Sequence, residues 1–274
     1  MKRLCCVLAC LIICQLVMAT RPKIGLALGG GGAKGAATIG VLRTIEEAGI
    51  KVDYIAGTSI GALIGGLYSA GSSIDEIEEF VFSQEIPSII DSYQFERMLD
   101  KRLIKHKCEL MEYTRIPFRC TATNSEEMKE IILSKGSLSK AIVASMSVPI
   151  AFEPMRINRM DLYDGGLLNN LPVDVVKAMG ADIIIAIDLQ QNEDDGLQIP
   201  SLGLGGIFDI VAEWSAKRPD KRKYKENVKA ADIYIHPSLT GYNAASFGRS
   251  NCEVMKRKGI EAAKQHLHEL IKLK

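Results

Sequence analysis

The chain has 274 residues, 47% of them hydrophobic and 24% charged, and its formal net charge is +1. This composition is typical of a globular protein with a substantial buried core, and the length allows one or two domains. The chain has neither a basic arm nor an acidic tail, so the sequence does not predict a nucleic-acid partner.

The first 19 residues are expected to form a targeting leader. After a short cationic start, residues 4–19 are apolar apart from Gln15, and small residues at Val17 and Ala19 suit signal-peptidase cleavage after Ala19. Alternatives are a lipoprotein modified at Cys10, a leader without an export role, and an uncleaved anchor, although a spanning helix needs roughly 20 apolar residues. We therefore expect an exported protein, either periplasmic or secreted and membrane-associated.

Four of the seven cysteines lie in this leader, and the other three are scattered at Cys108, Cys120 and Cys252. The sequence has no Cys-x-x-Cys pair, and no histidine cluster stands near a cysteine. It therefore predicts neither a disulfide framework nor a metal site.

Strand and helix patterns alternate immediately after the leader. Residues 23–28 are predicted to form a buried strand, followed by a glycine-rich loop and a helix over residues 36–48. A second strand at 52–56 leads into a helix that ends near residue 70. Two strands joined by one helix predict a right-handed crossover and a parallel sheet.

The rest of the chain mixes helices and strands in what we predict to be a single domain over residues 20–274. Helices are expected at 74–81, 95–104, 139–146, 173–179 and 245–273. Strands are expected at 118–123, 130–134, 182–189 and 233–236, with a short apolar stretch at 162–163. Residues 190–206 form a long loop that is a candidate lid.

A serine motif lies between the second strand and its helix. Residues 57–61 read Gly57, Thr58, Ser59, Ile60 and Gly61, a G-x-S-x-G pattern. In a strand–turn–helix context this pattern makes a sharp turn that exposes the serine hydroxyl at the helix N-terminus. Free N–H groups and the helix dipole there favour developing negative charge. We interpret Ser59 as a nucleophile; the alternative is a structural turn.

The glycine-rich loop after the first strand has three interpretations. Its residues are Gly30, Gly31, Gly32, Ala33, Lys34 and Gly35. The spacing satisfies a dinucleotide fingerprint, but the acidic residue that follows, Asp53, starts the second strand instead of ending it. A phosphate-binding loop fails because no Ser or Thr follows Lys34. We favour an oxyanion hole built from bare backbone N–H groups, with close packing as the remaining alternative. Lys34 is expected to be solvent-exposed.

A catalytic serine requires a base, and Asp164 is the favoured candidate. It precedes Gly165 and Gly166, which leave its carboxylate approachable on a tight turn. A carboxylate accepts the serine proton directly if burial raises its pKa. A Ser-Asp-His triad is the alternative, because Ser59, Asp164 or Asp188, and His236 follow the chain order of α/β-hydrolases.

These three motifs together resemble the signature of patatin-like phospholipases, especially the short bacterial members. The similarity continues through residues 145–149 (SMSVP), 169–173 (NNLPV) and 245–249 (ASFGR), and covers nearly all of residues 23–265. The resemblance implies a three-layer α/β/α fold with a mainly parallel central sheet. It also implies a Ser59–Asp164 dyad, residues 30–35 as oxyanion hole, and hydrolysis of lipid acyl esters without metal or cofactor. The leader departs from this pattern, since many short members lack one.

The resemblance implies a lipid or lysophospholipid substrate and contact with a membrane surface. A catalytically silent membrane-associated effector of the same fold is a second hypothesis, although the intact Ser59 and Asp164 favour an enzyme. Headgroup preference, chain-length preference and oligomeric state do not follow from the sequence.

Overall fold

The computed structural model describes residues 21–83, 91–149, 152–191 and 221–273. The leader expected over residues 1–19 and most of the loop expected over residues 190–206 lie outside these ranges. Among the described residues, no helix combines the length and the apolar character needed to cross a membrane.

Eight strands in the described part of the chain form one sheet. They are β1 (Ile24–Leu28), β2 (Tyr54–Gly57), β3 (Phe118–Asn124), β4 (Lys129–Leu133), β5 (Met155–Ile157), β6 (Met160–Asp164), β7 (Ile183–Ile187) and β8 (Ile233–Ile235). The order is β5-β6-β3-β2-β1-β7-β8, with β4 also paired to β3. The five strands β3, β2, β1, β7 and β8 run parallel, and β4, β5 and β6 add an antiparallel extension at one end.

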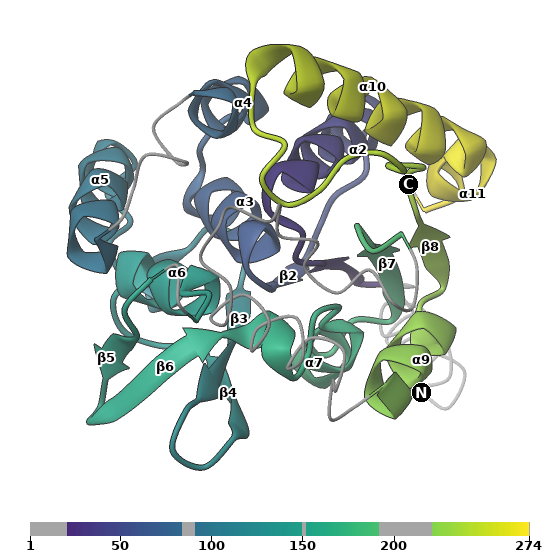
Figure 1. Ribbon diagram of the computed structural model, residues 1–274. Coiled ribbons are helices and arrows are strands. Elements are labelled where there is room, and N and C mark those ends of the chain that lie inside the picture. Colours follow the sequence, from purple (N-terminus) through teal and green to yellow (C-terminus); the bar gives the residue numbers. More distant parts are fainter. Residues whose placement is uncertain (1–20, 84–90, 150–151, 192–220, 274) are drawn as a thin grey trace, which may run out of the picture.

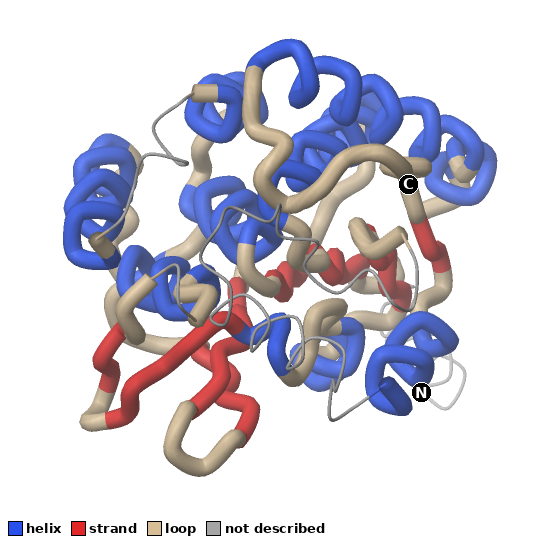
Figure 2. Tube along the Cα trace, viewed as in Figure 1, coloured by secondary structure: helices blue, strands red, loops and turns tan. Residues whose placement is uncertain are grey.

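Helices cover both faces of this sheet (Figures 1 and 2). One group consists of α2 (Gly35–Glu47), α3 (Ile60–Ala70), α4 (Ile74–Phe82), α10 (Arg249–Gln265) and α11 (Leu267–Ile271), with α5 (Ser92–Lys105) and α6 (Leu138–Met146) beside it. The opposite group consists of α7 (Val173–Met179) and α9 (Lys221–Ala230). The prediction of a three-layer α/β/α fold with a mainly parallel sheet is confirmed.

The two faces of β1 differ in side-chain size, and this difference positions the layers. Ile24, Leu26 and Leu28 are fully buried in the larger core, which also contains apolar side chains of α2 and α3. Gly25 and Ala27 alternate with them and point to the other face, as the period of two requires. A Cβ at Gly25 would lie 2.1 Å from a Val176 methyl, so glycine allows α7 to pack directly on the sheet.

Helices α2 and α10 cross at very short range because each supplies a glycine. A Cβ at Gly259 would lie 2.0 Å from the Ala37 carbonyl oxygen, and one at Gly40 would lie 2.1 Å from the Lys256 carbonyl oxygen. The C-terminal helix thereby packs against the helix that follows the glycine-rich loop.

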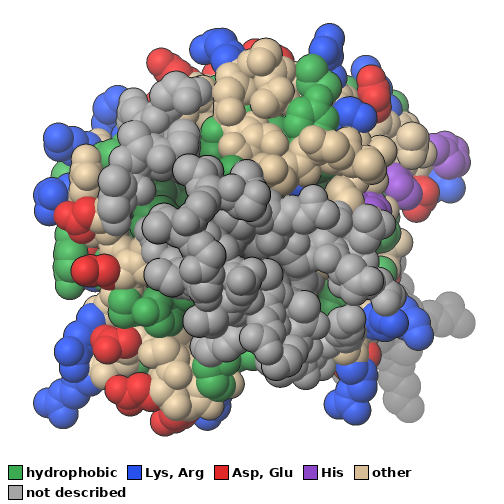
Figure 3. All heavy atoms as spheres, viewed as in Figure 1, with side chains coloured by type: hydrophobic (Ala, Val, Ile, Leu, Met, Phe, Trp, Pro, Cys, Tyr) green, Lys and Arg blue, Asp and Glu red, His purple; other side chains and the backbone are tan. Residues whose placement is uncertain are grey.

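Most elements agree with the expected ones, but β6 is a full strand where only a short apolar stretch at residues 162–163 was expected. The sequence pattern does not predict β5 or α9, and the helix expected over residues 245–273 is divided at His266 into α10 and α11. On the face shown in Figure 3, Lys and Arg side chains surround the outline and are interspersed with acidic ones, in keeping with the near-zero net charge.

Candidate active site

Ser59 stands at a strained turn between β2 and α3. Its backbone angles are φ 55° and ψ −125°, a conformation that costs a non-glycine residue about 1–3 kcal/mol and is common at functional sites. Both flanking glycines are required by close backbone contacts. A Cβ at Gly57 would lie 2.4 Å from the Gly61 carbonyl oxygen, and one at Gly61 would lie 2.2 Å from the Leu28 carbonyl oxygen.

The register of the sheet brings Asp164 next to this turn. Gly57, the last residue of β2, pairs with Cys120 of β3, and Asp164, the last residue of β6, pairs with Ala122. Strand β4 pairs with both Cys120 and Ala122, so it occupies one edge of β3 while β2 and β6 share the other. Strands β2 and β6 therefore meet end to end along this edge of β3. Asp164 lies just beyond the point where β2 ends and the chain turns at Ser59.

The carboxyl group of Asp164 is buried, with only 6% of the residue exposed. Burial raises its pKa from 3.8 to about 6, because a charged carboxylate loses hydration there. A hydrogen bond from the Gly166 N–H, at 2.7 Å, and the interaction with the Ser59 hydroxyl act in the opposite direction and limit the rise. The side chain thus combines contact with Ser59 and a pKa close to neutrality, as a general base requires.

The glycine-rich loop lies directly against Ser59. A Cβ at Gly30 would lie 3.1 Å from the Ser59 Cβ, so the loop approaches the serine as closely as a bare backbone permits. Four of its six N–H groups are engaged within the fold: those of Gly30, Ala33, Lys34 and Gly35 donate to backbone carbonyls. Gly31 and Gly32 are partly exposed, and their N–H groups have no acceptor among the described residues.

Lys34 does not behave as expected from the sequence. It is only 8% exposed, so the expectation of a solvent-exposed lysine is wrong. The residue closes the short 3-10 turn Gly32–Lys34 that leads into α2, and this turn carries it into the interior. Its N–H donates to the Gly31 carbonyl at 3.2 Å, which helps to set the shape of the loop.

Asn170 connects the glycine-rich loop with the Asp164 turn. Its backbone carbonyl accepts from the Gly30 N–H at 3.1 Å, and its Nδ2 donates to the Gly30 carbonyl at 3.3 Å. A Cβ at Gly166 would lie 2.8 Å from Asn170 Oδ1 and 3.0 Å from Asp164 Oδ1. The sequence motifs do not indicate a role for Asn170, although it lies in the NNLPV stretch that carries part of the resemblance.

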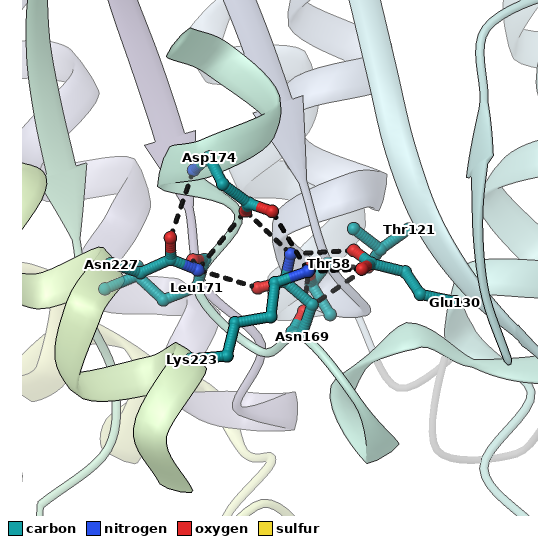
Figure 4. Close-up of polar contacts among 8 residues, drawn as sticks. All are labelled: Thr58, Thr121, Glu130, Asn169, Leu171, Asp174, Lys223 and Asn227. Atoms are coloured by element: carbon teal, nitrogen blue, oxygen red, sulfur yellow. Dashed lines mark hydrogen bonds and ion pairs between the residues drawn. The ribbon is translucent and has the colours of Figure 1, made fainter. Parts of the chain in front are cut away.

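A partly buried polar network contacts Thr58, the residue that precedes Ser59 (Figure 4). The Thr58 hydroxyl donates to the Asn169 carbonyl at 2.8 Å and also contacts the Thr121 hydroxyl. The Asn169 amide in turn donates to Glu130 and Asp174, at 2.7 and 2.8 Å. From α9, Lys223 forms ion pairs with both carboxylates, and Asn227 bonds both Asn169 and Asp174 (Figure 4).

The residues of the alternative interpretations lie elsewhere. His236 follows β8, three strands from β2, which corresponds to roughly 14 Å at the usual strand spacing. Its Nε2 contacts the Gln190 carbonyl. Asp188 is fully buried and accepts hydrogen bonds from Tyr224 and Tyr234. Neither His236 nor Asp188 is brought to Ser59.

Asp53, the acidic residue of the dinucleotide alternative, is engaged where the sheet begins. It accepts two hydrogen bonds from Arg21 and one from the Ile24 N–H, all within 2.8 Å. It lies before β2, at the end of the sheet opposite to the glycine-rich loop. The structure therefore gives the dinucleotide interpretation no ribose-binding acid.

Cys108, Cys120 and Cys252 are free and buried. Within the described part of the chain, no group of three or more His, Cys, Asp or Glu side chains could hold a metal ion.

The architecture and the turn at Ser59 together define an α/β protein with a serine at a strand–helix junction, a neighbouring buried carboxyl group and a glycine-rich loop. The model of the patatin-like phospholipase family matches residues 26–177. This match spans more than half of the chain and includes all three motifs. The chain belongs to the patatin-like phospholipase family.

Curated relatives and solved structures are consistent with this assignment. The chain is 29% identical to lysophospholipase nte1 of Aspergillus fumigatus, over 90% of this chain and 18% of the relative. It is 32% identical to lysophospholipase nte1 of Aspergillus niger, over 70% of this chain and 14% of the relative. The chain thus spans less than a fifth of the length of these relatives. VipD from Legionella pneumophila shares the fold, with a TM-score of 0.62 at 13% identity over 92% of this chain and 67% of VipD.

Proposed function

We propose that the chain is a serine lipid acyl hydrolase with Ser59 as nucleophile and Asp164 as base. The observation that carries the proposal is the buried carboxyl group of Asp164, which interacts with the Ser59 hydroxyl and whose pKa is raised to about 6. At pH 7 most of this carboxyl group is ionised, and it is still basic enough to accept a proton.

The proposed reaction has two halves. Ser59 Oγ attacks the carbonyl carbon of an acyl ester while Asp164 accepts the hydroxyl proton, and the tetrahedral intermediate collapses to an acyl-enzyme. Asp164 returns the proton to the departing alcohol oxygen. Water then attacks the acyl-enzyme while Asp164 accepts its proton, and Asp164 passes that proton to Ser59 Oγ as the second tetrahedral intermediate collapses and the fatty acid leaves. Every proton is supplied or accepted by the one carboxyl group.

Gly31 and Gly32 are the best candidates for binding the oxyanion in both halves. They carry the two loop N–H groups without an acceptor among the described residues, and their loop lies against Ser59. The N–H of Ser59 itself is engaged, since it donates to Ser145 Oγ at 2.9 Å. Of the six residues predicted for the oxyanion hole, these two are proposed to contact the oxyanion, and the others to hold the loop.

We expect Gly32→Ala to lower kcat by about a hundredfold or more, the effect typical of losing one oxyanion donor. Gly32 has φ 57°, and an added Cβ would lie 2.4 Å from the Ala244 carbonyl oxygen, so the loop must shift. The control is Gly136→Ala, which also places alanine at positive φ but meets no atom within 4 Å. Steady-state kinetics of the two folded variants provide the comparison, and equal kcat values would remove Gly32 from the oxyanion hole.

We expect His236→Ala to retain ester hydrolysis within about twofold of the wild type. The histidine lies three strands from β2 and contacts the Gln190 carbonyl. Initial rates on a short p-nitrophenyl ester measure the effect. A folded His236→Ala protein without activity would favour the Ser-Asp-His alternative instead, because loss of a triad histidine costs several orders of magnitude in rate.

The substrate class follows from the family and from relatives named lysophospholipases, and we propose a lysophospholipid or related lipid ester. Release of fatty acid from lysophosphatidylcholine micelles by the purified chain tests this, with Ser59→Ala as control for contaminating activity. If the chain hydrolyses p-nitrophenyl esters but releases no fatty acid from lysophosphatidylcholine, the proposed esterase activity stands and the proposed lysophospholipid substrate is wrong. Export and membrane association remain proposals that rest on residues 1–19 and on the substrate.

A further inference from the structure

The C-terminal end of α6 contacts the backbone of both Ser59 and Asp164. Ser145 Oγ accepts a hydrogen bond from the Ser59 N–H at 2.9 Å. Two residues further on, the Ser147 carbonyl accepts from the Asp164 N–H at 2.8 Å. One helix end therefore holds the backbone of the proposed nucleophile and that of the proposed base, which belong to two different strands.

This helix end is itself firmly held. Ser145 is fully buried, and Ser147 is 1% exposed, with its hydroxyl donating to the Val143 carbonyl at 2.9 Å. One turn earlier the buried Cys120 thiol of β3 donates to the Ala141 carbonyl. The Ser145 hydroxyl is thus presented to Ser59 from a buried and hydrogen-bonded helix end.

The Ser59 N–H has no acceptor within α3, and Ser145 Oγ is its hydrogen-bond partner. Ser59 adopts a positive φ, which a non-glycine residue keeps only where its surroundings impose it. Its N–H precedes the first turn of α3 and has no partner in that helix, so Ser145 Oγ supplies the acceptor. Losing it would free the serine turn to relax and would move Ser59 Oγ relative to Asp164.

We infer that Ser145 is a positioning residue for catalysis. It holds the backbone of Ser59 so that the hydroxyl faces Asp164, and it takes no part in proton transfer. The inference rests on the proposed function. Helix α6, which contains none of the three motifs, is then the element that fixes the geometry between nucleophile and base.

The test compares Ser145→Ala with Ser139→Ala in the full chain. Ser139 lies on the same helix and is fully buried, and its hydroxyl bonds the Ser137 hydroxyl, away from Ser59. Both variants remove one buried hydroxyl from α6. We expect Ser145→Ala to lower kcat for a p-nitrophenyl ester by about tenfold to a hundredfold with KM nearly unchanged, because small misplacements of reacting groups have effects of this size.

A second readout isolates the nucleophile. The rate constant for labelling Ser59 by a fluorophosphonate probe requires no deacylation, and we expect it to fall with kcat in Ser145→Ala but not in Ser139→Ala. Ser145→Cys provides a variant of nearly the same volume, in which sulfur is a weak acceptor, and we expect the same slow labelling. Thermal unfolding of each protein shows whether slow labelling accompanies loss of the fold.

The outcomes separate the inference from the function on which it rests. Labelling of Ser145→Ala and Ser145→Cys at the wild-type rate would overturn the role of Ser145 and leave the proposed function intact. Equal slowing in Ser139→Ala would also overturn it, since any lost hydroxyl of α6 would then have the same effect. A wild-type protein that neither hydrolyses esters nor labels would overturn both.

Discussion

Replacing Asp164 with asparagine is expected to remove nearly all hydrolysis while making the folded protein more stable at neutral pH. The amide cannot accept the proton of Ser59, so we expect kcat to fall by about a thousandfold, within the range typical of a lost general base. Asparagine keeps an oxygen in the position that accepts the Gly166 N–H, so the turn retains its hydrogen bond.

The stability change follows from the raised pKa. The carboxyl group has a pKa of 3.8 as its ordinary value and about 6 in the fold, so the folded protein binds the proton more tightly. The stability contributed by the protonated group is complete below pH 4 and is lost as the pH rises through 6. At pH 8 the ionised Asp164 lowers the free energy of unfolding by about 3 kcal/mol relative to its protonated form. An asparagine at this position carries no charge, so Asp164→Asn does not have this loss of stability.

Two measurements check this prediction. Denaturant unfolding at pH 5 and pH 8 should show a stability gain of Asp164→Asn that is clear at pH 8 and shrinks at pH 5. The pH profile of wild-type kcat/KM should rise through about pH 6, as the base loses its proton. A variant less stable than wild type at pH 8, together with a flat profile, would mean that Asp164 is not a buried base.

The Ser59→Ala substitution is expected to have the largest effect on activity. It removes the attacking oxygen, and knocking out a nucleophile of this kind costs about a millionfold in kcat. The fold should persist, because alanine fits the space that serine leaves. Loss of the Ser59 hydroxyl should raise the pKa of the Asp164 carboxyl group further, because the interaction with that hydroxyl lowers it.

Fatty-acid release by Ser59→Ala should therefore fall to the background of the assay. Ser73→Ala provides a control, since Ser73 caps α4, lies beyond the opposite end of α3 from Ser59, and accepts the Glu76 N–H through its hydroxyl. We expect Ser73→Ala to lower stability by about 1 kcal/mol, the usual value of a helix cap, and to keep its activity. Residual activity of Ser59→Ala above that of the buffer would point to another nucleophile.

Much of the architecture is predictable because its signals are local. The buried strand Ile24–Leu28 and the helix Val173–Met179, for example, show clear apolar patterns. Glycines indicate many of the turns that connect successive elements. The sequence pattern does not predict helix α9, and the reason is physical. Only Tyr224 and Val228 of this helix pack on the core, and Asn227 and Lys223 beside them are satisfied by polar groups of distant segments, so the apolar pattern is too short to indicate a helix.

The same distinction applies to the candidate site. Three short motifs can be identified from the sequence alone because their glycines are required by the local backbone. They are the turn at Ser59, the loop at Gly30 to Gly35 and the turn at Asp164. Their assembly depends on the end-to-end meeting of β2 and β6 along β3, which is a property of the sheet register. The contributions of Asn170 and Ser145 come from contacts across more than 80 residues of chain, where sequence spacing offers no guide.

The central claim is that Ser59 is the nucleophile, and its most direct test is to find which residue a fluorophosphonate probe modifies. The whole chain would be labelled, digested and analysed by peptide mass spectrometry, alongside a heat-denatured sample. We predict one adduct, on Ser59, present in the native sample and missing from the denatured one. An adduct on a different serine, or none on native protein that hydrolyses esters, would contradict the account.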